Sequence, residues 1–182
     1  MISEQQKPVN SGFGAKSEPS EILEGIDLNG KVAMVTGGYS GIGLETVRGL
    51  KDSGARIIVP ARRTDVAKSE LSGVVKEGDI FEMDLADPTS VTRFVNEFND
   101  SGTSLDILIN NAAVMACPQM PTKEGWDLQF AVNHIGHFIL TKGLLNVMSQ
   151  SSEARIVTLS STGHKLSGIQ WEDIHFENSY DK

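Results

Sequence analysis

The sequence has little cysteine and no long hydrophobic run. Cys117 is the only cysteine among its 182 residues, which excludes an intrachain disulfide and is typical of a protein in a reducing compartment. The N-terminus lacks the basic and then apolar layout of a secretory signal peptide, and no apolar run approaches the length of a membrane span. These absences predict a cytoplasmic protein without a membrane span.

Positive charge is also scarce. The 16 Lys and Arg residues stand against 24 Asp and Glu residues, which gives a formal net charge of −8. This balance argues against a nucleic-acid partner, because such surfaces need clustered lysine and arginine. The hydrophobic share of 39% is ordinary for a soluble domain, and a chain of this length can bury a sizeable core.

The most informative glycines stand together in the segment Thr36–Gly43, directly after the apolar run 32–35. This order predicts a strand, a tight turn and a helix whose free N–H groups and positive dipole end attract a phosphate. The glycine spacing differs from the general G-x-G-x-x-G fingerprint, and Leu44 stands where a nucleotide-triphosphate loop needs lysine. An ordinary glycine-rich turn is the alternative interpretation of this segment alone.

Predicted strands and helices alternate along the rest of the chain. Short apolar runs indicate further strands at 56–60, 78–84, 105–109 and 155–159. Helical patterns occur at 41–53, 64–72, 124–148 and in a stretch that begins with Asp87 as N-cap and Pro88 as first helical residue. This alternation predicts an α/β fold, a Rossmann-type doubly wound parallel sheet with helices on both faces. We expect a polar lead-in at 1–28 and one dinucleotide-binding domain at 29–182.

The carboxyl ends of parallel strands share one edge of the sheet, where ligands bind. The residues that end or follow the five predicted strands are Gly37, Arg62, Asp84, Asn111 and Ser161. Arg62 and Arg63 favour NADP over NAD, because a guanidinium binds a 2′-phosphate where an NAD site has a carboxylate. Asp84 could accept a hydrogen bond from an adenine amino group. Taken singly, these residues could also be solvated arginines and ordinary turn residues.

Polar residues interrupt the apolar helix predicted at 124–148. A buried amide needs a hydrogen-bond partner, so Asn133 either contacts a neighbouring element or belongs to a site. His134 and His137 are three residues apart, as metal ligands can be, but no third ligand is evident and we predict a structural pair without a metal. The sequence has no G-x-S-x-G segment, which excludes an esterase nucleophile of that type.

Together these motifs resemble the short-chain dehydrogenase/reductase family over about Lys31–Ser161. The T-G-x-x-x-G-x-G loop of the family is matched by Thr36–Gly43, and its N-N-A-G segment by 110–113, with Ala113 in place of the last glycine. The phrases around Asn133 and Ser161, and the tail segment 174–176, are similar to the retinol dehydrogenase-like branch.

The resemblance implies an oxidoreductase that interconverts a small alcohol and a carbonyl by hydride transfer with NADP, or less favourably with NAD. It implies that Asn133 supports a water-linked proton relay and that Ser161 hydrogen-bonds the substrate oxygen. The cofactor-binding residues that it implies are Gly37, Tyr39, Ser40, Gly41, Ile42, Gly43, Arg62, Arg63, Asp84, Leu85, Asn111, Ala112 and Ala113. It is also compatible with a homo-oligomer.

The catalytic Tyr-x-x-x-Lys segment of the family is missing from these residues. Tyr39 lies in the glycine turn, and the fourth position after Tyr180 falls beyond Lys182. We therefore expect a C-terminally incomplete fold, truncated before this segment, that binds nucleotide, turns over poorly and exposes apolar surface. The alternatives are a catalytically incompetent nucleotide-binding or interaction protein and an S-adenosylmethionine methyltransferase, which would normally have an acidic residue where Arg62 stands.

Overall fold

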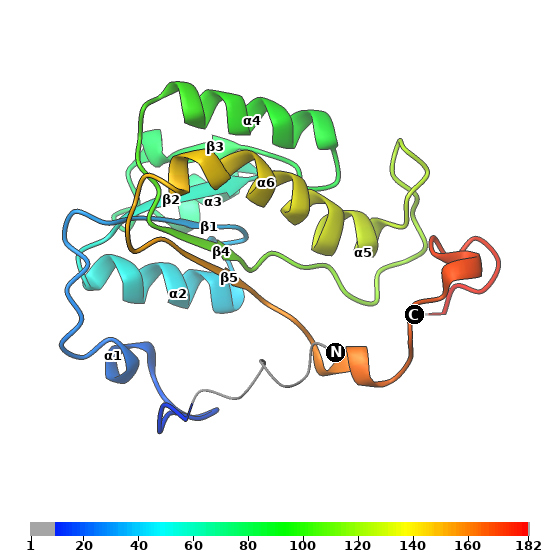
Figure 1. Cartoon of the computed structure of the whole chain (residues 1–182), viewed down its shortest axis with the longest axis horizontal. Coiled ribbons are helices and arrows are strands. Elements are labelled where there is room, and N and C mark those ends of the chain that lie inside the picture. Colours follow the sequence, from blue (N-terminus) through cyan, green and yellow to red (C-terminus); the bar gives the residue numbers. More distant parts are fainter. Residues whose placement is uncertain (1–9, 182) are drawn as a thin grey trace.

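The chain forms a five-stranded parallel sheet in a computed structural model that describes residues 10–181 (Figure 1). The strand order is β3-β2-β1-β4-β5, with bounds β1 Val32–Val35, β2 Arg56–Ala61, β3 Ile80–Glu82, β4 Ile107–Asn110 and β5 Arg155–Thr158. Ala33 of β1 pairs with Ile57 of β2 on one side and with Ile107 of β4 on the other. The direction of chain progression reverses between β1 and β4, which confirms the Rossmann-type sheet and marks its ligand-binding crevice.

Helices cover both faces of the sheet. In Figure 1, α4 and α6 lie on one side of the strands and α2 lies on the other. The bounds of the longer helices are α2 Gly41–Asp52, α3 Thr64–Glu70, α4 Pro88–Asp100 and α6 His137–Met148. The start of α4 is as predicted, because Asp87 caps it by accepting hydrogen bonds from the backbone N–H groups of Thr89 and Ser90.

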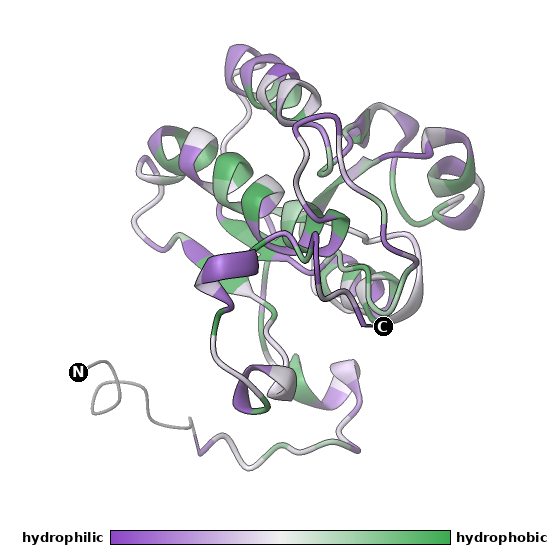
Figure 2. Cartoon of the chain, turned by 90° about the vertical axis from the view of Figure 1, so that its right-hand side faces the viewer, coloured by the Kyte–Doolittle hydropathy of each residue, from purple (hydrophilic) through white to green (hydrophobic). Residues whose placement is uncertain are grey.

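Side chains of the central strands alternate between two hydrophobic clusters. Met34 belongs to the cluster that contains Phe94 of α4, and Val35 belongs to the cluster that contains Val47 of α2. All four side chains are fully buried, and each contributes roughly 1.5–3 kcal/mol through burial. Burial on both faces explains why the strands are continuous apolar runs. Figure 2 shows hydrophobic segments in the middle of the molecule.

The helix predicted at 124–148 begins later than expected. Gly125 has a φ of +78° in a turn, and Asp127 caps the following segment by accepting a hydrogen bond from Phe130 N at 2.9 Å. A short helix, α5 Leu128–Phe130, leads into a π-helical segment at Ala131–Gly136 and then into α6. The prediction for 124–127 is therefore wrong, because the turn and the cap fix the helix start.

Short 3-10 turns occur at three further places among the described residues. The turn Glu77–Asp79 precedes β3, so the strand predicted at 78–84 is confined to Ile80–Glu82. Two further turns, Thr162–Lys165 and Trp171–Asp173, follow β5. They agree with the absence of a strong hydrophobic period in the tail.

The described part of the predicted lead-in, residues 10–28, contains one short helix, α1 Pro19–Ile22. The segment after α1 lies beside α2, because a Cβ added at Gly49 would be 3.0 Å from Cδ1 of Leu23. Residues 1–9 of this lead-in lie outside the described residues, and the boundary at residue 28 stays a prediction. Within residues 10–181, no helix is both long enough and apolar enough to cross a bilayer.

Apolar side chains of β5 and α6 are exposed in the part of the chain that the structure describes. Ile156 and Val157 of β5, the edge strand, are 43% and 47% exposed. Phe138 and Leu145 of α6 are 61% and 48% exposed. The expected apolar surface is therefore present among the described residues, next to an unpaired strand edge.

Candidate cofactor site

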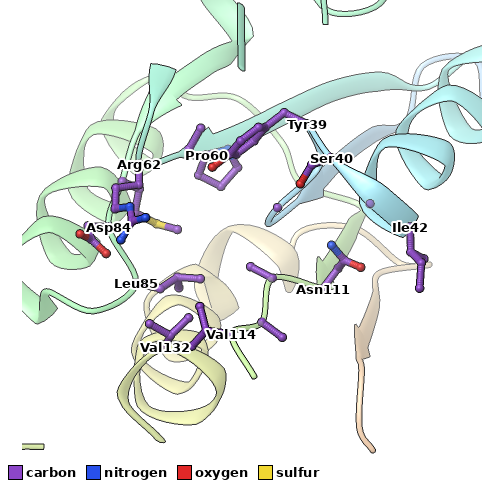
Figure 3. A pocket seen from close by; sticks show the side chains of 16 residues that line it. Tyr39, Ser40, Ile42, Pro60, Arg62, Asp84, Leu85, Asn111, Val114 and Val132 are labelled. Carbon is purple, nitrogen blue, oxygen red and sulfur yellow. The ribbon is translucent and has the colours of Figure 1, made fainter. Parts of the chain in front are cut away.

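A cavity of about 340 Å³ lies at the carboxyl ends of β1 to β4 (Figure 3). Eleven of its lining residues are among those that the sequence predicted: Gly37, Tyr39, Ser40, Ile42, Gly43, Arg62, Asp84, Leu85, Asn111, Ala112 and Ala113. Figure 3 shows Arg62 and Asp84 at one end of this cavity and Asn111 and Ile42 at the other. The cavity therefore connects the end of β2 with the turns after β1 and β4.

The glycine turn requires glycine for two different reasons. Gly37 has a φ of +66°, which side chains other than glycine rarely adopt. Gly43 lies in α2, where an added Cβ would be 2.3 Å from the Gly37 carbonyl oxygen and 2.5 Å from Nδ2 of Asn111. Only glycine at position 43 lets the start of α2 approach the strand ends this closely. The conformation of this turn and its packing against the strand ends therefore both require glycine.

The first turn of α2 has an open N-terminus. Ser40 is its N-cap residue, but the Ser40 side chain makes no capping hydrogen bond and no acidic residue lies in the first turn. In α4, by contrast, Asp87 occupies the corresponding N–H groups. The N–H groups and positive dipole end of α2 thus remain available to an anionic ligand. Gly41, the first residue of α2, has a φ of +52° and does not line the cavity.

Thr36 joins the turns after β1 and β4. Its hydroxyl oxygen accepts hydrogen bonds from the backbone N–H groups of Asn111 at 2.9 Å and Ala112 at 3.0 Å. The side-chain amide of Asn111 donates in return to the Thr36 carbonyl oxygen at 2.8 Å. These three bonds fix the two cavity walls at the point where the strand order reverses.

The two predicted arginines differ in position. Arg62 is exposed and lines the cavity, and it takes part in none of the ion pairs among residues 10–181. Arg63 immediately precedes α3 and is not among the lining residues. Asp84 uses one carboxylate oxygen to accept from the backbone N–H of Ala86 at 2.9 Å. Arg62 is therefore the arginine that can reach a ligand in this cavity.

Asn133 is placed differently from the buried amide that we expected. It is exposed, but its side chain does contact a neighbouring element: Oδ1 accepts from Val114 N at 2.9 Å and Nδ2 donates to Val114 O at 2.8 Å. Asn133 lies in the π-helical segment, a type of helix distortion that often occurs at functional sites. Val132 beside it and Val114 both line the cavity.

The two histidines of this helix have separate partners. His134 stacks on Phe130, with ring centroids 5.3 Å apart. His137 is buried, and its Nε2 lies 2.9 Å from the Thr36 hydroxyl oxygen. Residues 10–181 contain no group of three histidine, cysteine or acidic side chains arranged to hold a metal.

Ser161 does not line the cavity. Its exposed side chain accepts a hydrogen bond from Gly163 N at 3.1 Å and caps the 3-10 turn after β5. Tyr180 donates its hydroxyl proton to the Cys117 carbonyl oxygen and accepts from Nε2 of Gln129 at 3.1 Å. Burial and the side chain of Cys117 raise the pKa of Tyr180, whereas the chemistry implied by the family resemblance needs a tyrosine with a lowered pKa. Tyr180 is therefore not suited to serve as the proton donor of this site.

Five lining residues were missed by the sequence analysis: Pro60, Ala61, Met83, Val114 and Val132. Pro60, Ala61, Met83 and Val114 lie within two positions of a predicted cofactor-binding residue and would be found by extending each strand end by one or two positions. Val132 comes from the π-helical segment, and no local pattern predicts that this segment reaches the cavity.

Comparisons with known proteins agree with this geometry. A family model described as short chain dehydrogenase matches residues 31–172. Retinol dehydrogenase 11 of Mus musculus is 41% identical over 160 residues, which covers 85% of this chain and 51% of the relative. The chain spans about half the length of the curated relatives that it matches.

Two solved structures have a similar fold. The crystal structure of an uncharacterized protein from Mycobacterium paratuberculosis is 33% identical with a TM-score of 0.73, covering 86% of this chain and 55% of that chain. A metagenomic short-chain oxidoreductase in complex with NADP is 28% identical with a TM-score of 0.63, covering 74% of this chain and 63% of that chain.

Proposed function

This chain belongs to the short-chain dehydrogenase family, and we propose that its cavity binds NADP in preference to NAD. The family consists of oxidoreductases that use a nicotinamide cofactor. The observation that carries the proposal is the pairing of an uncapped helix start at Ser40 with Arg62 in one cavity. These two features are suited to the two kinds of phosphate that NADP carries.

The pyrophosphate would be held at the start of α2. The close approach at Gly43 leaves no room for a side chain, and the free N–H groups of the first turn are suited to bind phosphate oxygens. Arg62 would hold the 2′-phosphate by charge-assisted hydrogen bonds at the end of β2. Asp84 beside it would accept from the adenine amino group through the carboxylate oxygen that Ala86 does not use.

The nicotinamide end would lie against the turn after β4. Asn111, Ala112 and Ala113 form this wall, and Thr36 fixes its backbone. When bound, NADPH would supply the hydride that reduces a carbonyl, and NADP⁺ would accept the hydride from an alcohol. We propose that Asn133 supports proton movement beside this wall and that Ser161 hydrogen-bonds the substrate oxygen in the whole protein.

Turnover by these 182 residues alone is expected to be negligible. Neither tyrosine of the sequence is followed four residues later by lysine, and the hydroxyl of Tyr180 is already engaged. A nucleotide-binding protein without catalysis is therefore the second candidate. A small alcohol or carbonyl substrate, a homo-oligomer and a cytoplasmic location remain predictions that accompany the proposal, the last supported by the single cysteine.

A ligand titration tests the proposal directly. The chain is titrated separately with NADP⁺, NAD⁺ and S-adenosylmethionine, and the heat of binding is measured. We expect NADP⁺ to bind at least about tenfold more tightly than NAD⁺, because a charge-assisted phosphate contact contributes roughly 1.5–3 kcal/mol. We expect no binding of S-adenosylmethionine. Equal affinity for the two nicotinamide cofactors would contradict the preference, and binding of neither would contradict the cofactor assignment.

A further inference from the structure

His137 is a buried titratable residue to which the cofactor proposal gives no role. It is the first residue of α6 and is only 4% exposed. Both ring nitrogens have partners: Nε2 lies 2.9 Å from the Thr36 hydroxyl oxygen, and Nδ1 lies 3.2 Å from the Asn133 carbonyl oxygen. The imidazole thus bridges the glycine turn and the π-helical segment.

The hydrogen bonds of Thr36 fix the protonation of this ring. A hydroxyl group has two lone pairs and one proton. Both lone pairs of Thr36 are used by the backbone N–H groups of Asn111 and Ala112. The hydroxyl must therefore donate its proton, and Nε2 of His137 at 2.9 Å is a better acceptor position than Ile109 O at 3.4 Å.

The second ring nitrogen completes this assignment. Nδ1 faces a carbonyl oxygen, which only accepts, so Nδ1 must carry the ring proton and donate it to Asn133. The bonding pattern corresponds to the neutral imidazole with its proton on Nδ1. This form satisfies both partners, and burial of the ring lowers the pKa of His137 in agreement with a neutral state.

We propose that His137 is a positioning residue of the cofactor site, whose neutral Nδ1-protonated ring orients the Thr36 hydroxyl and thereby holds the backbone of Asn111 and Ala112 in the cavity wall. The proposal rests on the proposed function, because that wall is where the nicotinamide end would lie. His137 itself does not line the cavity, so it acts on the cavity wall through Thr36.

Protonation of His137 would break this arrangement. The cationic ring presents N–H groups from both nitrogens, so Nε2 would compete with Asn111 and Ala112 for the two lone pairs of Thr36. Three donors cannot share two lone pairs, and the turn after β4 would loosen. Among residues 10–181, the one other titratable group that influences the pKa of His137 is His134 of the π-helical segment, whose positive charge, when present, lowers it. β1 and the turn after β4 contribute neutral groups, namely Thr36, Asn111 and Ala112.

Two variants separate the hydrogen-bond role from packing. His137→Gln retains an amide oxygen that can accept the Thr36 proton but cannot be protonated near neutral pH. His137→Phe retains a ring of similar shape and removes both hydrogen bonds. Amide hydrogen exchange of Asn111 and Ala112 reads out the cavity wall without any cofactor, and circular dichroism checks that each variant is folded.

The expected result has two parts. The protection factors of both amides in the natural chain, which correct for the intrinsic slowing of exchange at lower pH, should decrease as the pH falls from about 8 to about 5.5, and NADP⁺ affinity should fall by about fivefold over the same range. His137→Gln should lose both pH effects, and His137→Phe should show fast exchange and weak binding at each pH. Unchanged exchange in folded His137→Phe, or a pH effect retained by His137→Gln, would overturn the proposal. Failure of the natural chain to bind NADP⁺ would overturn the proposed function, while the exchange data still decide the role of His137.

Discussion

The side chain of Asn133 pairs with the backbone of Val114 as both donor and acceptor. The two bonds, of 2.9 and 2.8 Å, join residues that are 19 positions apart in the chain. They fasten the π-helical segment to the residues that leave β4 along the cavity. Asn133 therefore has a structural function in this chain whether or not it also supports proton movement.

Replacing Asn133 by alanine should loosen this attachment. Loss of two hydrogen bonds predicts a decrease of about 1–2 kcal/mol in the free energy of unfolding, measured by urea denaturation. The amide of Val114 should also exchange faster. Asn146→Ala is the matched control, because Asn146 is exposed on α6 and its side chain makes no hydrogen bond among residues 10–181. Equal effects of the two variants would contradict the structural function of Asn133.

Gly43→Ala should strongly weaken cofactor binding. The new Cβ would collide with the Gly37 carbonyl oxygen and Asn111 Nδ2, so the start of α2 must move away from the strand ends. We expect an NADP⁺ affinity at least about tenfold weaker by calorimetry and a loss of about 1–3 kcal/mol in stability. Gly78→Ala is the control, because an added Cβ there meets no atom within 4 Å. A Gly43→Ala chain that binds normally would show that the turn is not the phosphate site.

Arg62→Glu should reverse the cofactor preference. A carboxylate at the end of β2 repels a 2′-phosphate but can accept hydrogen bonds from the ribose hydroxyls of NAD. NADP⁺ affinity should fall by about tenfold or more, with NAD⁺ affinity unchanged or improved, in the same calorimetric titration. Arg63→Glu adds the same charge at a position that does not line the cavity and should have a smaller effect. If Arg63→Glu has the larger effect, the assignment of the phosphate partner is wrong.

Asp106 should make stability depend on pH in the acidic range. Burial opposes its charge, but the Val32 N–H, the Ser151 hydroxyl and the Lys31 ammonium group outweigh burial and lower the pKa of Asp106. A lowered pKa in the folded state means that its stabilisation is present above the unfolded pKa of about 3.9 and is lost as the pH falls through the folded pKa. Asp106→Asn should reduce the free energy of unfolding at neutral pH by about 1–3 kcal/mol. The free energy of unfolding of this variant should also decrease less steeply as the pH falls.

Urea denaturation at a series of pH values measures this effect. The exposed carboxylate of Asp100 at the end of α4 provides the control, since Asp100→Asn should leave the slope between about pH 5 and 3 unchanged. If the Asp106→Asn chain still loses as much stability at acidic pH as the natural chain, carboxylates other than Asp106 cause that loss.

The exposed apolar side chains of β5 and α6 should limit the solubility of this chain. Leu145 is 48% exposed, whereas its neighbour Leu144 is fully buried in the sheet-facing cluster. Leu145→Ser should reduce self-association in light scattering with little change in stability, because it removes exposed apolar surface. Leu144→Ser should instead unfold or strongly destabilise the chain, by about 3 kcal/mol or more. A natural chain that is monodisperse and melts cooperatively would contradict the expectation that these exposed side chains cause self-association.

Structural features with a local signal in the sequence are the ones that can be predicted from it. Asp87 and Pro88 specify the start of α4 within three residues, and that start is confirmed. The strand ends were also found, because four of the five predicted positions line one cavity. The burial expected for Asn133 was wrong because its partner, Val114, is distant in the chain and only half-buried itself.

Other features arise only from the folded arrangement. The role of Thr36 was not predicted, because the turn after β4 meets its hydroxyl only when β1 and β4 pair. Ser161 follows a predicted strand end, yet the chain turns away there into a 3-10 turn, so its catalytic role stays a prediction. The reach of Val132 into the cavity likewise depends on the π-helical segment.

Amide hydrogen exchange with and without saturating NADP⁺ tests the central claim most directly, because it locates the ligand as well as detecting it. We predict protection in two separated segments, 36–43 and 111–114, which form the walls of one cavity. Protection confined to another surface, or none in these segments at a concentration where calorimetry detects binding, would contradict the assignment of this cavity as the cofactor site.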